Sequence, residues 1–141
     1  MKHYINSAII YAIMAMAGGV FFREFTKFYS FTQKTTLSVV HTHYFILGTT
    51  FFLILILFDK SFSFSNKKTH KILVAYHIGL NITNIMLLIR GITQVSAINI
   101  SYGLDKAISG IAGMGHIILS ISIILLMLQI KKSVSTNLLK N

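Results

Sequence analysis

Four of the six histidines in this chain lie inside long apolar segments, where an ionisable side chain is rare. They are His41, His43, His77 and His116. A neutral imidazole can bind a metal, move a proton or form hydrogen bonds. Ionisable residues at membrane depth usually face a bundle interior or a cavity. The other two, His3 and His70, lie in polar flanks, where contact with water or lipid headgroups is expected.

The spacing of His41 and His43 limits what this pair can bind together. On an α-helix, residues i and i+2 are separated by about 200° around the axis. The two rings therefore cannot aim at the same point, and one compact metal ion chelated by both is disfavoured. A close two-histidine grip on one helix uses i, i+4 spacing instead. We expect one ring to face the bundle centre and the other a side groove or an interface.

Several other chemistries lack the residues they need. The chain has no cysteine, which excludes disulfides, thiolate-bound iron–sulfur clusters and covalently attached c-type haem. Its three carboxylates, Glu24, Asp59 and Asp105, lie in loops or at a helix boundary. General acid–base catalysis by paired carboxylates, and zinc enzymology that depends on such a base, are therefore unsupported.

The elements that must position the histidines are four apolar segments. The sequence is 54% hydrophobic and 11% charged, against about 25% charged residues in soluble domains. A helix needs about 20 residues to cross a bilayer, so each segment is long enough. We predict an all-α fold, an integral membrane four-helix bundle forming a single transmembrane domain over 1–141. The expected spans are 5–22, 37–58, 72–92 and 107–130, and the first lacks a cleavage site and is expected to be retained.

The basic residues indicate the orientation. They fall in the gaps between apolar segments and form no single patch, so the net charge of +10 does not favour nucleic-acid binding. Eight of the 13 lysines and arginines lie at the two chain ends and in the second loop. The positive-inside rule then places both termini in the cytoplasm, in a multi-pass protein of the cytoplasmic membrane.

Small residues are concentrated in the first and fourth segments. Ala8, Ala12, Ala15 and Gly19 form a smooth ridge that allows close approach of another helix. The stretch SGIAGMGH places glycines in the turns before His116. These glycines either permit tight helix packing or leave room for a flat ligand.

Histidines on different helices at similar depth suit haem b. Along their helices, His43 lies about 10 Å and His116 about 16 Å from the predicted outer edge, with His77 roughly 20 Å from it. Non-covalent haem needs one or two imidazoles, an apolar slot and cations for its propionates. The metal ligand candidates are His43, His116 and His41, and His77 is a further cofactor-binding candidate. Gly110 and Gly113 could form the slot. Arg90 could bind a propionate, and Tyr44 could hydrogen-bond to a ligand histidine. Copper bound by imidazoles is left open.

Three stretches of the sequence resemble a known family. They are VVHTHYFILGTTFFLILIL, YHIGLNITNIMLLIRGI and GLDKAISGIAGMGHI. In these the chain resembles the small four-span membrane proteins of Gram-positive bacteria of the haem-sensing membrane protein (HsmA) type. The resemblance implies haem binding in the membrane and a link to tolerance of haem and oxidants. It carries over to His41, His43 and His116 as ligand candidates and to Arg90 as a polar anchor.

The sequence thus favours a membrane protein that captures haem b and contributes to tolerance of haem and oxidative stress. One alternative is a membrane b-type cytochrome that takes electrons from a quinol or reduces a small oxidant. Another is a transporter of haem or copper, and a third is a structural subunit whose histidines are satisfied core residues. The expected partners are the lipid bilayer and haem, and association into a homo-oligomer is left open.

Overall fold

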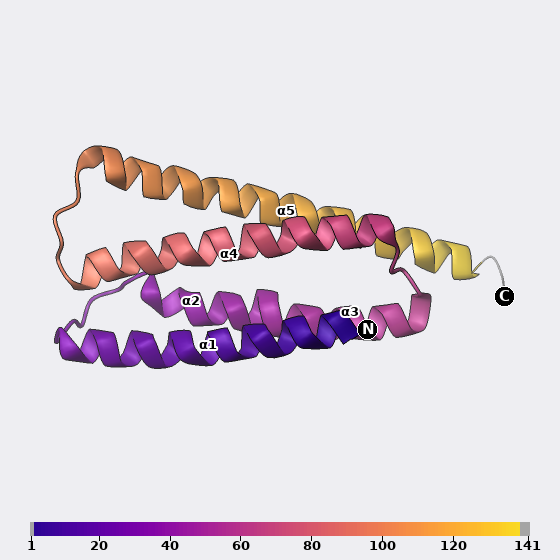
Figure 1. Cartoon of the computed structure of the whole chain (residues 1–141), viewed down its shortest axis with the longest axis horizontal. Coiled ribbons are helices and arrows are strands. Elements are labelled where there is room, and N and C mark those ends of the chain that lie inside the picture. Colours follow the sequence, from indigo (N-terminus) through magenta and orange to yellow (C-terminus); the bar gives the residue numbers. More distant parts are fainter. Residues whose placement is uncertain (1, 139–141) are drawn as a thin grey trace.

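The computed structural model of the chain describes residues 2–138, and every regular element in that range is helical (Figure 1). Three of the elements, α2, η1 and α3, follow one another without a break and form one rod. The elements are α1 (Lys2–Phe28), α2 (Leu37–His43), the π-helix η1 (Tyr44–Thr50), α3 (Phe51–Phe62), α4 (Lys67–Val95) and α5 (Tyr102–Leu138).

The helices form four rods that are long and apolar enough to cross a membrane: Lys2–Phe28, Leu37–Phe62, Lys67–Val95 and Tyr102–Thr136. This confirms the prediction of an all-α protein with four spans. Each helix is longer than the apolar segment that predicted it, because the polar flanks continue the helix. The chain has no proline, so no helix interior loses a backbone donor to it.

The four rods are arranged as two helical hairpins. In one, α1 packs along the rod made of α2, η1 and α3, and in the other α5 packs along α4. The hairpins meet where α4 contacts α2 and η1 and where α3 contacts α5. The start of α1 and the end of α5 lie at one end of the bundle, and the α1–α2 and α4–α5 loops lie at the other (Figure 1).

The helix ends are closed by local hydrogen bonds. The Asn66 side chain caps α4 by accepting from the backbone N–H groups of Lys68 and Thr69, at 2.9 and 3.0 Å. After α1, Ser30 adopts a left-handed conformation with φ of 49°, and the N–H of Phe31 donates to the carbonyl of Thr26. This arrangement satisfies carbonyls that the end of the helix leaves free.

Small residues hold the rods close together. A methyl group added at Gly79 of α4 would lie 2.7 Å from the backbone nitrogen of Leu119 on α5. On the ridge predicted for α1, Ala8 and Ala15 are buried. The Tyr11 ring between them lies against Gly48, where an added Cβ would be 2.5 Å from the ring. Close backbone approach of this kind is typical of helices packed in membranes.

The π-helix η1 begins directly after His43 and widens the helix next to α1 and α4. Two tyrosines approach it there, since the Tyr11 ring lies against Gly48 and the Tyr76 hydroxyl donates to the carbonyl of Leu47. Single π-turns inside α-helices are often found at functional sites. Here the π-helix separates the turn that carries the histidines from the apolar helix that follows.

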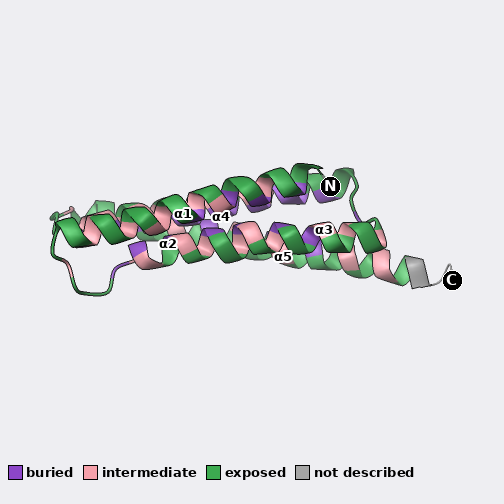
Figure 2. Cartoon of the chain, turned by 90° about the horizontal axis from the view of Figure 1, so that it is seen from below, coloured by how far each residue is buried: buried purple, intermediate pink, exposed green. Residues whose placement is uncertain are grey.

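The side of each helix that faces outward is apolar. Large side chains such as Ile13, Met16 and Ile117 are more than half exposed, while buried residues line the contacts between rods (Figure 2). In a soluble protein so much exposed apolar surface would cause aggregation. In a bilayer it is the surface expected to contact the lipid chains.

The contact between Gly79 and α5 can be tested by substitution. We expect Gly79→Ala to destabilise the protein by about 1–3 kcal/mol, because the new methyl group meets backbone atoms that cannot move aside cheaply. Thermal unfolding in detergent, followed by circular dichroism, measures the change. The control is Gly103→Ala, where an added methyl meets nothing within 4 Å. Equal stability of the two variants would contradict the packing described here.

Candidate functional site

His43 of α2 and His116 of α5 lie next to each other at the surface of the bundle, where His43 is half-buried and His116 is exposed. Their ring centroids are 6.4 Å apart and the ring planes are perpendicular, at 90°. The two residues are 73 positions apart in the sequence and belong to different helices. Because their rings are neighbours, the two histidines lie at a similar depth, as the sequence predicted.

Both rings are held in the same way by their own helices. Nδ1 of His43 lies 2.8 Å from the carbonyl oxygen of Val39, and Nδ1 of His116 lies 2.8 Å from that of Ala112. A carbonyl oxygen can only accept, so Nδ1 donates in both cases. In a neutral imidazole this leaves the lone pair on Nε2. Neither Nε2 has a hydrogen-bond partner in the described part of the chain. A backbone bond at Nδ1 that fixes the tautomer is common in metal-binding histidines.

The glycines before His116 divide into two groups. Gly115 faces α4, where an added Cβ would be 2.8 Å from Oγ1 of Thr83, so it serves tight packing. Gly110 and Gly113 face open space, with nothing within 4 Å of an added Cβ. Gly115 therefore bears out the packing alternative, while a flat ligand beside Gly110 and Gly113 stays a prediction. The open pair lies within two turns of His116.

His41 points away from this pair, as its spacing from His43 predicts. Its Cβ lies 3.7 Å from the position that a Cβ would take at Gly18 and 3.8 Å from that at Gly19, both on α1. Its ring stacks against Phe22 with centroids 6.4 Å apart. The buried Nδ1 of His41 has no hydrogen-bond partner in the described residues. The ring thus lies between α1 and α2, and His116 is not among its contacts.

His77 belongs to a polar network inside the bundle. Its Nδ1 lies 2.6 Å from the hydroxyl of Tyr11, and its ring stacks on Phe52 with centroids 4.9 Å apart. The amide of Asn81 donates to the Tyr11 hydroxyl, at 3.2 Å, and its carbonyl oxygen accepts from the Tyr44 hydroxyl, also at 3.2 Å. The network joins α1, η1 and α4.

His77 and Tyr44 bond within this network and make no hydrogen bond to His43 or His116. Tyr44 was expected to hydrogen-bond to a ligand histidine, but its hydroxyl binds Asn81 instead. The sequence did not single out Tyr11. Two features of the sequence could have indicated its role. Tyr11 lies on the helix between Ala8 and Ala15, and Asn81 follows His77 by four residues, on the same face of its helix.

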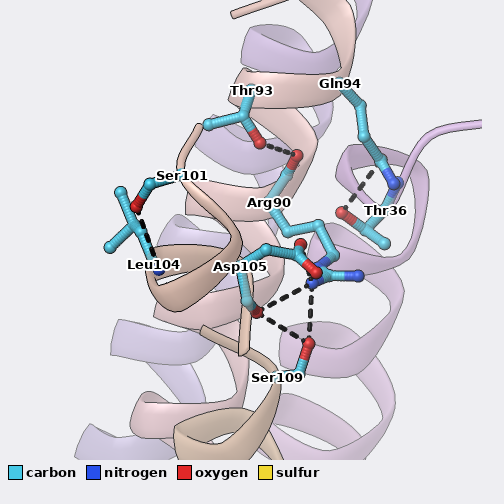
Figure 3. Close-up of polar contacts among 8 residues, drawn as sticks. All are labelled: Thr36, Arg90, Thr93, Gln94, Ser101, Leu104, Asp105 and Ser109. Atoms are coloured by element: carbon cyan, nitrogen blue, oxygen red, sulfur yellow. Dashed lines mark hydrogen bonds and ion pairs between the residues drawn. The ribbon is translucent and has the colours of Figure 1, made fainter. Parts of the chain in front are cut away.

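Arg90 joins α4 to α5 near the loop between them (Figure 3). Its Nη2 lies 2.7 Å from Oδ1 of Asp105 and 2.7 Å from Oγ of Ser109. The guanidinium group was predicted to bind a haem propionate, but in the structure one of its nitrogens binds the carboxylate of Asp105. A guanidinium group has five N–H donors. Within the described residues only those on Nη2 have protein partners.

The arrangement can offer two imidazole nitrogens to one ligand. Within residues 2–138, no group of three or more histidine, cysteine, aspartate or glutamate side chains is placed to hold a metal ion. A metal ion bound by side chains alone generally takes three or four of them. Haem takes only one or two, because the porphyrin supplies the other ligands.

The network around Tyr11 can be tested by removing one oxygen atom. We expect Tyr11→Phe to lower the free energy of unfolding by about 0.5–2 kcal/mol, because His77 and Asn81 each lose a partner in the interior. The control is Tyr102→Phe, whose side chain is 79% exposed. Thermal unfolding in detergent compares them. The interpretation is wrong if Tyr11→Phe is as stable as Tyr102→Phe.

Comparison with known proteins identifies a family. A family model described as "Protein of unknown function (DUF2871)" matches residues 1–133, which takes in the first three spanning helices and most of α5. Neither the curated proteins nor the solved structures contain a significant match to the chain. The chain belongs to the DUF2871 family.

Proposed function

We propose that this chain binds haem b within the membrane, with His43 and His116 as the axial ligands of the iron. The observation that supports this most strongly is the pair of rings 6.4 Å apart on different helices, each with Nδ1 bonded to a backbone carbonyl. These bonds leave Nε2 of both rings available to a metal. Bound haem would supply an iron centre able to change oxidation state.

The separation of the rings matches the size of such a site. If each coordinating nitrogen lies about 2 Å from the metal, two imidazoles on opposite sides of one ion have centroids about 6 Å apart. The observed 6.4 Å is close to this value. Copper at this pair would rely on the two imidazoles alone, because no group of three or more candidate ligands exists in the described residues.

Groups around the pair suit the remainder of a haem. Gly110 and Gly113 are exposed with open space around them, and Gly113 lies only about 60° around α5 from His116. Ser109, which binds Arg90, lies seven residues before His116, or about 10 Å along the helix and on nearly the same face. The unpaired donors of Arg90 are therefore within reach of a propionate. Arginine suits this role, since its fork matches a carboxylate.

The biological role that we propose is capture of haem in the cytoplasmic membrane. Holding haem lowers the free pool and contributes to tolerance of haem and oxidants. The resemblance of the chain to HsmA-type proteins supports this role. The distribution of lysine and arginine supports an orientation with both termini in the cytoplasm. The His43–His116 pair would then lie nearer the outer surface.

Electron transfer is a second candidate function, favoured by the same pair of rings. An iron held by two imidazoles has no free position for oxygen or peroxide. Such a site suits the movement of electrons better than chemistry on a bound oxidant. A quinol in the membrane would then be a suitable electron donor.

The ligand assignment is tested by replacing histidines one at a time. We expect His43→Ala and His116→Ala each to abolish or shift the Soret band of the haem-loaded protein. Each should also weaken haem binding by at least about tenfold, since even the partners of metal ligands contribute about 10–100-fold. Haem titration followed by absorption spectroscopy measures both effects.

His41→Ala and His77→Ala are the matched controls, because their rings contact α1 and Tyr11 and not His116. Both variants should keep the spectrum of the unchanged protein. An unaltered spectrum in His116→Ala would falsify the assignment. Loss of the Soret band in His41→Ala alone would show that His41, on the other side of α2, is the ligand instead of His43.

The open space beside His116 is tested by filling it. We expect Gly113→Leu to leave stability unchanged, because the added side chain points into open space, and to weaken haem binding by occupying the slot. Gly103→Leu is the control, since it also faces open space but lies near the start of α5. Equal haem affinity in the two variants would show that this face of α5 plays no part in binding.

A further inference from the structure

A pocket of about 380 Å³ lies at the end of the bundle where α1 and α4 begin, on a different pair of helices from the His43–His116 pair. Its walls come from the first turns of α1, the start of α4 and the loop before it, and from Phe52 of α3. Its volume falls within the range of pockets that bind small organic molecules.

The pocket wall carries no permanently charged side chain. None of the residues that line this pocket is a lysine, arginine, aspartate or glutamate. The carboxylate of Asp59 accepts from the N–H of Ser65, a wall residue, but does not line the pocket itself, so the wall favours a neutral ligand. The pocket also contains three histidines, His3, His70 and His77. Because no metal-holding group exists within residues 2–138, these rings are spaced as separate hydrogen-bonding groups.

The hydrogen-bond network fixes what His77 can offer to a ligand. Asn81 donates to the oxygen of Tyr11, and the Tyr11 hydroxyl can then donate its proton to Nδ1 of His77. A neutral ring that accepts at Nδ1 carries its proton on Nε2. Nε2 is the nitrogen left for a pocket ligand, so His77 presents a donor. Ser7 and His70 add polar groups whose side chains have no partner in the described residues.

The pocket also has a flat aromatic side. Phe52 and His77 both line it and stack on each other, with centroids 4.9 Å apart and planes 10° from parallel. Tyr4, which lines it as well, stacks on Phe64 with planes 4° from parallel. Such surfaces favour a flat ring.

The pocket wall includes apolar residues on the outer surface of the bundle. Ile10 of α1 and Val74 of α4 line it, and both are strongly exposed, at 56% and 45%. In the bilayer they belong to the lipid-facing surface, so a ligand dissolved in the membrane can enter between the two helices.

We propose that this pocket binds the ring of a membrane quinone or quinol. Quinones and quinols are neutral, flat and soluble in lipid. Their oxygens can accept from Nε2 of His77 and from the Ser7 hydroxyl, and a quinol hydroxyl can also donate to Ser7 or His70. The inference does not rest on the proposed haem site.

Calorimetric titration of menadione into the unliganded protein in phosphatidylcholine nanodiscs tests the proposal, with empty nanodiscs as the blank. We expect saturable binding, and binding of 2-methylnaphthalene at least about tenfold weaker, because this control has a similar ring without the two oxygens. Equal binding of the two compounds, or no saturable binding of menadione, would overturn the proposal.

Substitutions then locate the site. We expect Ser7→Ala and His70→Ala each to weaken menadione binding about three- to tenfold through loss of one hydrogen bond. Ser120→Ala and Lys71→Ala, which lie outside the pocket, should bind as the unchanged protein does. Circular dichroism checks folding. His116→Ala should also bind menadione normally, so a failure of the haem site would leave this result unaffected. Normal affinity in both Ser7→Ala and His70→Ala would show that menadione binds elsewhere.

Discussion

The hydrocarbon core of a membrane offers no hydrogen-bond partners, and this constraint explains how many polar groups of the described residues are placed. The exceptions are four buried atoms without a partner: Nδ1 of His41, Oγ1 of Thr49, Oγ1 of Thr83 and Oδ1 of Asn84. A polar group in a spanning helix must find a partner within the protein, lie near the membrane surface or bind a ligand. Tyr11, His77, Asn81 and Tyr44 satisfy one another inside the bundle. Asn84 donates to the carbonyl of Leu80 in its own helix. The interior network therefore also holds α1, η1 and α4 together.

The histidines within the spans differ in what their bonded nitrogen contacts. Nδ1 of His77 lies against the Tyr11 hydroxyl and the ring stacks on Phe52, which ties His77 to two other helices. His43 and His116 have one nitrogen bonded to their own helix and the other without a protein partner in the described chain. Their ring centroids lie 6.4 Å apart, with perpendicular planes, on two different helices. The proposed haem would be held by these two side chains without a third.

The sequence was sufficient to predict what depends on periodicity and depth. Four spans, the divergence of His41 and His43, and the similar depth of His43 and His116 all follow from helix geometry. Which of His41 and His43 lies beside His116 did not follow, nor did the pairing of side chains. The bond between Tyr11 and His77 depends on how α1 packs against α4, and the π-helix contacts tyrosines of two other helices. The sequence also could not show which glycine before His116 packs against α4, because this depends on the rotation of α5 about its own axis.

The proposed haem site requires that imidazoles from both α2 and α5 would hold the iron. Absorption spectra of the reduced, haem-loaded protein with and without carbon monoxide test it most directly, because carbon monoxide binds ferrous haem only where an axial position is free. The account predicts a spectrum typical of two nitrogen ligands that carbon monoxide leaves unchanged. A Soret band that shifts on addition of the gas would show an open position, and the absence of a Soret band after haem addition would show that no such site exists.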